Sequence, residues 1–265
     1  MKRNALLLAL LLLAVPPAAA QEAPAWDPGY GMRFLSTHSP LVNDTGILET
    51  LFTHRFNQPV NEAGGNDLFG LDNGANIGIG LSWVPVRRVA AEVYRASSGG
   101  DYEIAAKVAV LEPTGERPLG IAVRAGASWM TKYDIDRKAG AFGQLLVAWT
   151  VADRVTIAAA PSYASNTPLF EDVFNVPLAL QVRLGRGLFA TGEYVFRNRD
   201  LDGSKGQWSF GLEKSVYRHR FLLWIGNSAA TTVDQTLAGD YAGGVMESNL
   251  RLGFNISRQF RIGGD

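Results

Sequence analysis

Cysteine is absent from the 265 residues, histidine occurs only three times, and neither sign of charge is in excess. Without cysteine the chain has no disulfide, no thiol chemistry and no cysteine-based metal site. Basic and acidic residues number 25 each, so no positive excess indicates a nucleic-acid partner. These absences exclude disulfide scaffolds, thiol enzymes and basic nucleic-acid binders, and they leave the hydrophobic pattern as the main signal.

A long apolar run is also missing after the first twenty residues. Lys2 and Arg3 precede a short apolar stretch that ends at Val15, and three alanines follow at positions 18–20. This order predicts a secretory signal peptide over residues 1–20, because a spanning helix needs ~20 apolar residues. Its removal leaves 23 basic and 25 acidic residues, a net charge of −2. We therefore expect an exported chain.

Apolar and polar residues alternate with period two through the rest of the chain. In one stretch Ile77, Ile79 and Leu81 are separated by Gly78 and Gly80. Such alternation is typical of strands with one apolar face. Twelve strands are predicted, near residues 46–56, 76–84, 88–97, 101–111, 119–131, 140–151, 154–165, 175–184, 187–198, 206–215, 219–228 and 248–260. The range 219–228 differs from the others because it carries apolar residues on both faces.

The predicted connections alternate in length. Short ones fall at 85–87, 152–153, 185–186 and 216–218, with 112–118 of intermediate length. Longer ones fall at 57–75, 132–139, 166–174, 199–205 and 229–247, and 98–100 is the short exception among them. Outer-membrane barrels combine short periplasmic turns with longer extracellular loops. The sequence thus predicts an all-β fold over residues 45–262, an antiparallel up-and-down transmembrane β-barrel of about 12 strands.

The two faces of the predicted strands differ in chemistry. The apolar face is expected to meet lipid and to carry aromatic girdles at both ends. The girdle residues are Phe56, Trp83, Tyr102, Trp129, Trp149, Tyr163, Tyr194, Phe196, Trp208 and Phe260. The opposite face is expected to line the lumen, with the charged residues Glu49, Arg55, Arg88, Glu92, Glu103, Lys107, Arg124, Arg154, Arg183, Glu193, Arg197, Glu213 and Arg251.

The state of the lumen stays open at this point. Twelve strands lie between the filled eight-stranded and the open sixteen-stranded barrels. Glu92 and Lys107 are expected to pair across one hairpin. Arginines at the periplasmic rim suggest a mild preference for anions if a pore exists, with a small polar or anionic solute and membrane lipid as partners. Residues 21–44 read as irregular, either a periplasmic tail or a lumen plug, and the tail is favoured because termini are usually loosely ordered.

Catalytic groups are scarce. His54 is expected on the lipid-facing side near the outer rim, where a Ser-His hydrolase acting on lipid would need it. No partner serine or acid is marked. The loop with Asp67 and Asp72 lacks the spacing of a calcium site, and no cofactor or metal is expected. The leading hypothesis is a non-enzymatic outer-membrane barrel, either a narrow channel or a filled binding or structural barrel. The alternatives are a lipid-modifying hydrolase using His54 and a soluble periplasmic β-protein.

Several segments resemble one family. Thr53-His54-Arg55-Phe56 is followed by residues 67–77, which read DLFGLDNGANI, and then by Gly80-Leu81-Ser82 and Tyr102-Glu103. This order is similar to the opening of a bacterial β-barrel family, domain of unknown function 5777, over residues 46–111. The resemblance implies a membrane barrel and supplies no activity and no catalytic residues. One departure is that residues 261–265 follow Phe260, whereas many outer-membrane barrels end on an aromatic residue.

Overall fold

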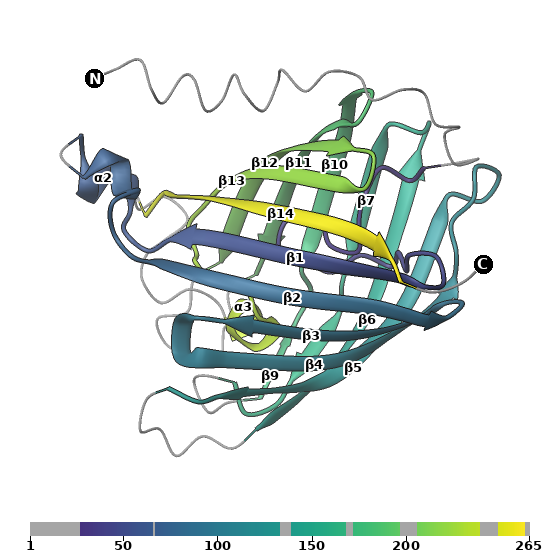
Figure 1. The fold of residues 1–265 in the computed structure, drawn as a ribbon, viewed down its shortest axis with the longest axis horizontal. Coiled ribbons are helices and arrows are strands. Elements are labelled where there is room, and N and C mark those ends of the chain that lie inside the picture. The colour runs from purple at the N-terminus through teal and green to yellow at the C-terminus, as the bar shows by residue number, and fades with distance from the viewer. Residues whose placement is uncertain are drawn as a thin grey trace.

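The computed structural model describes residues 27–65, 67–132, 139–167, 172–196, 206–238 and 249–262. The predicted signal peptide at 1–20 lies outside them. The described chain forms one antiparallel sheet that closes on itself where β1 (Ile47–Phe56) pairs with β14 (Arg251–Arg261) (Figure 1). The other strands are β2 (Ala75–Val86), β3 (Val89–Ala96), β4 (Asp101–Leu111), β5 (Leu119–Met130), β6 (Gly140–Val151), β7 (Val155–Ala159), β8 (Ser162–Ala164), β9 (Val173–Asn175), β10 (Leu178–Gly185), β11 (Leu188–Val195), β12 (Gln207–Val216) and β13 (His219–Gly226).

Twelve of these strands make the closed ring, and β8 and β9 extend two of its members. Pro161 separates β7 from β8, and Pro177 separates β9 from β10. Proline has no N–H donor, so the ladder stops there and resumes beyond it. The predicted strand 154–165 is therefore present in two pieces, β7 and β8. The predicted strand 175–184 corresponds to β10, and β9 begins within the predicted loop 166–174. The predicted barrel of about 12 antiparallel strands is confirmed.

The two ends of the barrel differ, as the connection lengths predicted. Turns of two or three residues join β2 to β3, β6 to β7, β10 to β11 and β12 to β13, all at one end, called here the short-turn end. The opposite, long-loop end carries the connection from β1 to β2, which includes the helix α2 (Val60–Ala63) and the 3₁₀ turn η1 (Leu68–Gly70). A second 3₁₀ turn, η2 (Ser98–Gly100), forms the short link from β3 to β4. No helix in the described parts of the chain is long and apolar enough to cross a membrane.

Side chains on the outer wall are apolar and exposed, and those on the inner wall are mostly polar and buried. Along β4, Ile104 and Val108 are about half exposed, whereas Glu103 and Lys107 are almost fully buried. This arrangement inverts the pattern of a soluble barrel, whose interior is apolar. It is the arrangement that a lipid environment requires.

Residues 27–44 fold inside the ring and are called here the plug segment. Their central part is a hairpin in which Arg33 pairs with His38, while Phe34 N–H donates to the Thr37 carbonyl at 2.9 Å. Tyr30, Leu35 and Ser39 are at most 1% exposed. The expected periplasmic tail is therefore wrong for residues 27–44, because the lumen wall supplies hydrogen-bond partners and apolar contacts that order the segment. Residues 21–26 lie outside the described residues.

A second segment enters the ring from the long-loop end. Residues 227–238, called here the inward loop, follow β13 and include the short helix α3 (Val233–Ala238). In Figure 1 this helix lies within the barrel, and it contacts β6, β8 and β9. Val233, Asp234 and Leu237 are buried. The sequence analysis predicted residues 229–247 as an external loop, because they show no strand alternation.

Candidate functional site: the occupied lumen

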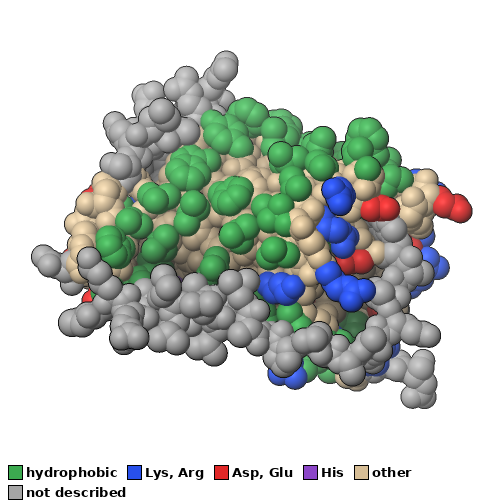
Figure 2. Space-filling model, turned by 90° about the horizontal axis from the view of Figure 1, so that it is seen from above, with side chains coloured by type: hydrophobic (Ala, Val, Ile, Leu, Met, Phe, Trp, Pro, Cys, Tyr) green, Lys and Arg blue, Asp and Glu red, His purple; other side chains and the backbone are tan. Residues whose placement is uncertain are grey.

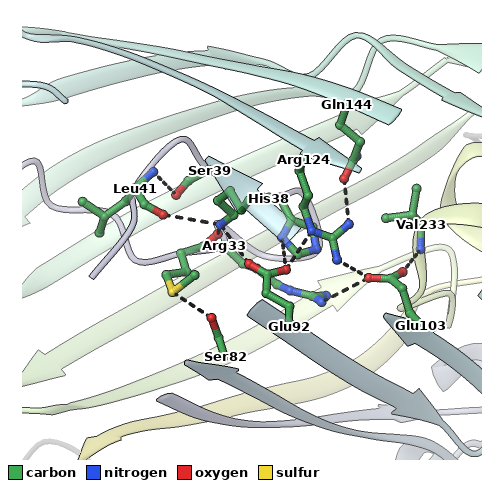
Figure 3. A network of polar contacts seen from close by, with 12 residues as sticks. Arg33, His38, Ser39, Leu41, Ser82, Glu92, Glu103, Arg124, Gln144 and Val233 are labelled. Atoms are coloured by element: carbon green, nitrogen blue, oxygen red, sulfur yellow. Dashed lines mark hydrogen bonds and ion pairs between the residues drawn. The ribbon is translucent and has the colours of Figure 1, made fainter. Parts of the chain in front are cut away.

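A network of buried charges crosses the middle of the lumen (Figure 3). Arg124 on β5 donates from Nε to Glu92 on β3 at 2.7 Å, and Lys107 Nζ on β4 lies 3.4 Å from the same carboxylate. All three side chains are at most 8% exposed. The predicted Glu92–Lys107 pair is confirmed. Adjacent strands place these residues on one inner face, because side chains at alternate positions share a face.

Glu103 connects this network to both internal segments. Arg124 Nη2 donates to Glu103 Oε1, and Arg33 of the plug segment lies 3.9 Å from that oxygen. The other carboxylate oxygen accepts the backbone N–H of Val233 at 2.9 Å. One carboxylate therefore binds the wall, the plug segment and the inward loop together. A buried carboxylate needs such partners, because leaving it uncompensated is costly.

Glu193 on β11 holds the tip of the plug segment. Its carboxylate accepts the backbone N–H groups of Leu35, Ser36 and Thr37 at 2.9, 3.0 and 2.9 Å. Three amides that converge on one carboxylate form strong, charge-assisted hydrogen bonds. The backbone N–H groups of the hairpin turn thus supply hydrogen-bond donors to the buried carboxylate of Glu193.

Four further wall side chains donate to main-chain carbonyls of the plug segment. Lys107 reaches Met32 O at 3.1 Å, and Asn255 reaches Leu35 O at 2.9 Å. Nearer the short-turn end, Arg220 donates to the carbonyl of Gly29 and Arg183 to that of Asp27, at 3.2 and 2.7 Å. The wall therefore recognises the path of the backbone more than the identity of its side chains.

Apolar contacts add to these hydrogen bonds. Tyr30 and Phe34 pack against a row of three alanines, Ala148, Ala158 and Ala179, that are register partners on β6, β7 and β10. Elsewhere Leu35 packs against inward-facing Leu222 and Trp224, and Met32 packs against Val84 and Ala90. The three small alanines leave room for the rings of Tyr30 and Phe34. The inward-facing apolar side chains of the wall cover Leu35 and Met32.

Little free volume is left along this segment. The cavities bordered by Met32 and Arg33 measure about 30 Å³ each, and a third, beside Thr37 and the inward loop, measures about 10 Å³. A volume of that size accommodates about one or two water molecules. The plug segment thus packs closely against the wall around these cavities.

His38 lies at the centre of the network. Its Nδ1 is 3.7 Å from Glu92, and neither ring nitrogen has a hydrogen-bond partner among the described residues. Burial holds the pKa of His38 well below its usual value of 6.5, and Arg124, Arg33 and Lys107 act in the same direction. The imidazole is thus neutral near pH 7.

The inward loop occupies another part of the lumen. Thr232 donates to Asp101 at 2.8 Å, and Ser128 donates to Asp234 at 3.0 Å. Leu237 packs in an apolar cluster with Phe142 and Val173 near the long-loop end. These contacts join the loop after β13 to β4, β5 and β6 across the ring.

The charged residues predicted to face the lumen fall into three groups. Glu49, Arg55, Glu92, Glu103, Lys107, Arg124, Glu193 and Glu213 are buried inside the ring. Arg88, Arg183 and Arg251 are half-buried at its ends, where Arg88 pairs with Glu112 and Arg251 donates to the carbonyl of Asn227. Arg154 is exposed in the turn between β6 and β7, because β7 begins one residue later than predicted. Arg197 lies outside the described residues.

The predicted girdle residues lie on the outer wall. Trp83, Trp149 and Phe260 are exposed near the short-turn end, and Trp129, Tyr163 and Phe196 are exposed near the long-loop end. Phe56, Tyr102, Tyr194 and Trp208 are partly exposed at the same long-loop level. Figure 2 shows one outer face, with hydrophobic side chains across its middle and basic ones gathered at one end. A role of these aromatics at a membrane interface stays a prediction.

His54 packs among aromatic rings on the outer wall. Its ring stacks on Phe254 at 5.0 Å between centroids and lies 4.4 Å from the ring of Phe56. Its Nδ1 has no hydrogen-bond partner among the described residues. Among the residues that the structure describes, no group of three or more histidine and acidic side chains is placed to hold a metal ion.

Sequence reasoning missed Arg33, His38, Asp101 and Asp234 as lumen residues. The first two belong to the segment interpreted as a tail, and Asp234 belongs to a presumed outer loop. Inward-facing Leu222 and Trp224 were the available signal, since apolar residues on the lumen face need a covering partner. Their presence explains the apolar residues on both faces of 219–228.

The closed ring, apolar outside and polar inside, defines a membrane-bound β-barrel with an occupied lumen. The family model of the membrane bound beta barrel domain, domain of unknown function 5777, matches residues 30–260, so the chain belongs to this family. The resemblance seen at residues 46–111 is thereby confirmed. The matched region also includes most of the plug segment, from Tyr30 onward.

Several solved outer-membrane structures are similar to this chain at low identity. The NanC porin has a TM-score of 0.49 and 6% identity, covering 80% of this chain and 98% of that one. An outer membrane channel from Pseudomonas putida F1 has a TM-score of 0.47 and 11% identity, covering 83% and 97%. Outer membrane phospholipase A from Escherichia coli has a TM-score of 0.46 and 11% identity, covering 80% and 89%. No curated protein matches the sequence.

Proposed function

We propose that this chain is a non-enzymatic outer-membrane barrel that is closed by its plug segment and conducts small solutes when that segment withdraws. The path of the plug segment carries the proposal. Its first described residue, Asp27, is bound by Arg183 at the short-turn end. Its far side reaches β1 at the same end, where the Gly46 N–H donates to Val84 O at 2.8 Å. A hairpin that enters and leaves by one end can withdraw without unthreading.

The polar side chains of the wall behind the plug segment favour a water-filled passage once that segment has withdrawn. Glu49, Arg55, Lys107, Glu193 and Asn255 point inward there. Glu193, Lys107 and Asn255 hold the plug segment through its main-chain N–H and C=O groups, and water can replace such contacts. A wall that stays covered by the plug segment at all times would be more stable with apolar side chains. The cost of burying a charged pair can exceed the attraction between its members.

A permanently filled binding or structural barrel is the second candidate. It is favoured by the apolar contacts of Tyr30, Phe34 and Leu35, each at most 3% exposed, and by the position of Arg33 beside Glu103. In this case the barrel would act through its outer wall and loops, and the plug segment would serve as its core.

Conductance in planar bilayers separates the two candidates. Four chains are compared: the full chain, a deletion of residues 27–44, a deletion of residues 229–238, and both deletions together. We expect silence from the full chain, small steps after removal of the plug segment, and larger steps after both deletions. Silence in all four would overturn the channel. Equal conductance in all four would show that the plug segment does not close it. Gel mobility before and after boiling identifies the variants that fold.

The rim arginines suggest which solutes would pass. Arg183 and Arg220 lie on the inner wall at the short-turn end, where they bind the plug segment, and Arg88 and Arg154 lie in turns at that end. Positive charge at an entrance raises the local concentration of anions. We expect a mild anion preference, and a cation-selective reversal potential in the double deletion would contradict it.

The non-enzymatic assignment and the location each have a direct test. The surroundings of His54 support the former, since its ring packs against Phe56 and Phe254 and its Nδ1 has no hydrogen-bond partner among the described residues. Phospholipid hydrolysis in detergent that is lost in His54→Ala would reverse the assignment. Release of the chain from membranes by carbonate would contradict the outer-membrane location.

A further inference from the structure

The outer surface between the β10–β11 turn and β14 carries a group of basic side chains at the short-turn end. We call this group the basic rim. Its members are Arg186 in the β10–β11 turn, Lys214 on β12, Arg218 in the β12–β13 turn and Arg258 on β14. Arg186 and Arg258 are exposed, and Lys214 and Arg218 are partly exposed.

Lys214 shows where the charges of the basic rim lie. In register it stands between Leu188 and Phe221, inside the apolar band of the outer wall. Its amino group does not stay there, because Nζ donates to the carbonyl of Arg186 at 3.0 Å, in the turn. A lysine whose stem covers apolar surface while its amino group reaches the polar edge follows the usual behaviour at a membrane interface.

Two arginines direct their charge to the same level. Arg258 places its guanidinium 4.7 Å from the ring centre of Phe260, which is two residues closer to the short-turn end. Arg218 lies 5.4 Å from the ring centre of Tyr217, which is exposed in the turn. The cationic groups and aromatic rings thus lie together at the edge of the apolar band nearest the short-turn end.

The members of the basic rim have no carboxylate partner among the described residues. The neighbouring Arg87 and Arg88 differ, since both lie 2.8 Å from Glu112. From the basic rim toward the long-loop end the outer wall is apolar, with Phe210, Leu212 and Leu223 exposed. Figure 2 shows a hydrophobic face with basic side chains at one end and a few acidic side chains among them. The uncompensated charge is therefore placed at the boundary between hydrocarbon and water.

We propose that the basic rim binds the headgroups of anionic phospholipids in the leaflet at the short-turn end. The phosphate and net negative charge of such a lipid match unpaired Arg and Lys groups, and its acyl chains continue onto the apolar wall above them. Anionic lipid surfaces attract basic residues at this depth. The proposal needs only a membrane barrel and does not depend on conduction.

The opposite end provides a matched control. There the outer surface carries Arg95, which lies over the ring of Tyr102 at 5.4 Å, and Lys132, which donates to the carbonyl of Ser97 at 3.3 Å. Arg218→Gln with Arg258→Gln removes two positive charges from the basic rim. Arg95→Gln with Lys132→Gln removes two from the other end. All four positions lie outside the lumen network, so the barrel interior is unchanged in both double variants.

The experiment measures lipid binding by the full-length chain. Native mass spectrometry counts lipids retained from detergent micelles doped with phosphatidylglycerol or with zwitterionic phosphatidylcholine. We expect preferential retention of phosphatidylglycerol, a reduction of more than about tenfold in Arg218→Gln/Arg258→Gln, and little change in the control, since each basic residue at an anionic surface contributes about fivefold.

Three outcomes would overturn the proposal. Equal retention of the two lipids by the wild type would show no charge recognition. Equal loss in both double variants would show that net charge matters and the basic rim does not. Displacement of the retained lipid by millimolar inorganic phosphate would show a simple anion site in place of a lipid site. None of these results bears on whether the plug segment closes a channel.

Discussion

Arg33 Nη1 donates a hydrogen bond of 3.4 Å to the carbonyl oxygen of Thr231, although the two residues are 198 positions apart. Arg33 belongs to the plug segment, which enters from the short-turn end, and Thr231 to the inward loop, which enters from the long-loop end. The same two segments share the carboxylate of Glu103, through Arg33 and the N–H of Val233. The lumen is thus filled by two independent insertions that meet near its middle, and each one stabilises the position of the other.

Replacement of Glu103 tests this meeting point. Glu103→Gln keeps an acceptor for the Val233 N–H but leaves Arg124 and Arg33 without one of their anions. Because it removes one member of a buried ion network, the free energy of unfolding should fall by roughly 3 kcal/mol. Urea unfolding in lipid vesicles, followed by tryptophan fluorescence, measures it.

Glu112→Gln is the matched control for that variant. Glu112 also has two arginine partners, but Arg87 is exposed and Arg88 is only half-buried, both in a turn at the short-turn end. Exposed pairs contribute little, so the expected change is below about 1 kcal/mol. Equal effects of the two variants would show that the Glu103 network is no more stabilising than a surface pair.

The barrel was predictable because the bilayer imposes a simple rule on each strand. Alternation in residues 77–83 predicts strand, outer face and inner face at once, and the Glu92–Lys107 pair follows from neighbouring strands. The plug segment has no such periodicity. It is held through main-chain groups by Glu193, Lys107 and Asn255, and main-chain groups are the same in every sequence.

Some information about the plug segment was nevertheless present on the wall. Ala148, Ala158 and Ala179 are inward-facing and adjacent in register, which leaves a space that a bulky group must fill. Leu222 and Trp224 are apolar at inward positions of β13. Such residues conflict with a water-filled lumen. Which segment of the chain covers them could not be derived, because nothing in their own strands specifies the partner.

Single cysteines can report whether the plug segment stays in place, because the natural chain contains none. Thr37 is 5% exposed and its hydroxyl has no hydrogen-bond partner among the described residues, so Thr37→Cys should fold normally. We expect its thiol to resist a water-soluble maleimide in the folded protein and to react after denaturation. Asp44→Cys, at an exposed position, should react immediately. Rapid labelling of Thr37→Cys in the folded barrel would show that the hairpin leaves the lumen spontaneously.

Gly211 on β12 tests the fit between the wall and the plug segment. A Cβ at this position would lie 2.7 Å from Leu35 Cδ2 and 2.8 Å from Leu222 Cδ1. Gly211→Ala should therefore displace Leu35 and lower the free energy of unfolding by about 1–3 kcal/mol, the range for overpacking. Gly192→Ala on the neighbouring strand is the control, since the nearest atoms there are 4.0 Å away. Equal urea midpoints for the two variants would contradict the described position of Leu35.

His38 makes the stability of the occupied lumen depend on pH. Burial, reinforced by Arg124, Arg33 and Lys107, holds the pKa of its imidazole well below 6.5, and the opposing attraction of Glu92 at 3.7 Å does not reverse this. The unfolded chain therefore binds a proton at His38 that the folded chain rejects. The stabilisation from a neutral His38 is complete above pH 6.5 and is lost as the pH falls toward the folded pKa.

The replacement His38→Gln removes that proton from both states and isolates the effect. We expect the urea midpoint of the wild type to decrease between pH 7 and pH 5 more steeply than that of His38→Gln, because all other titrating groups are common to the two proteins. Equal slopes would show that His38 gains its proton equally in the folded chain, which requires water to reach the imidazole. In that case Thr37→Cys, one residue away, should also label in the folded barrel, so the two measurements test the same closed lumen by independent means.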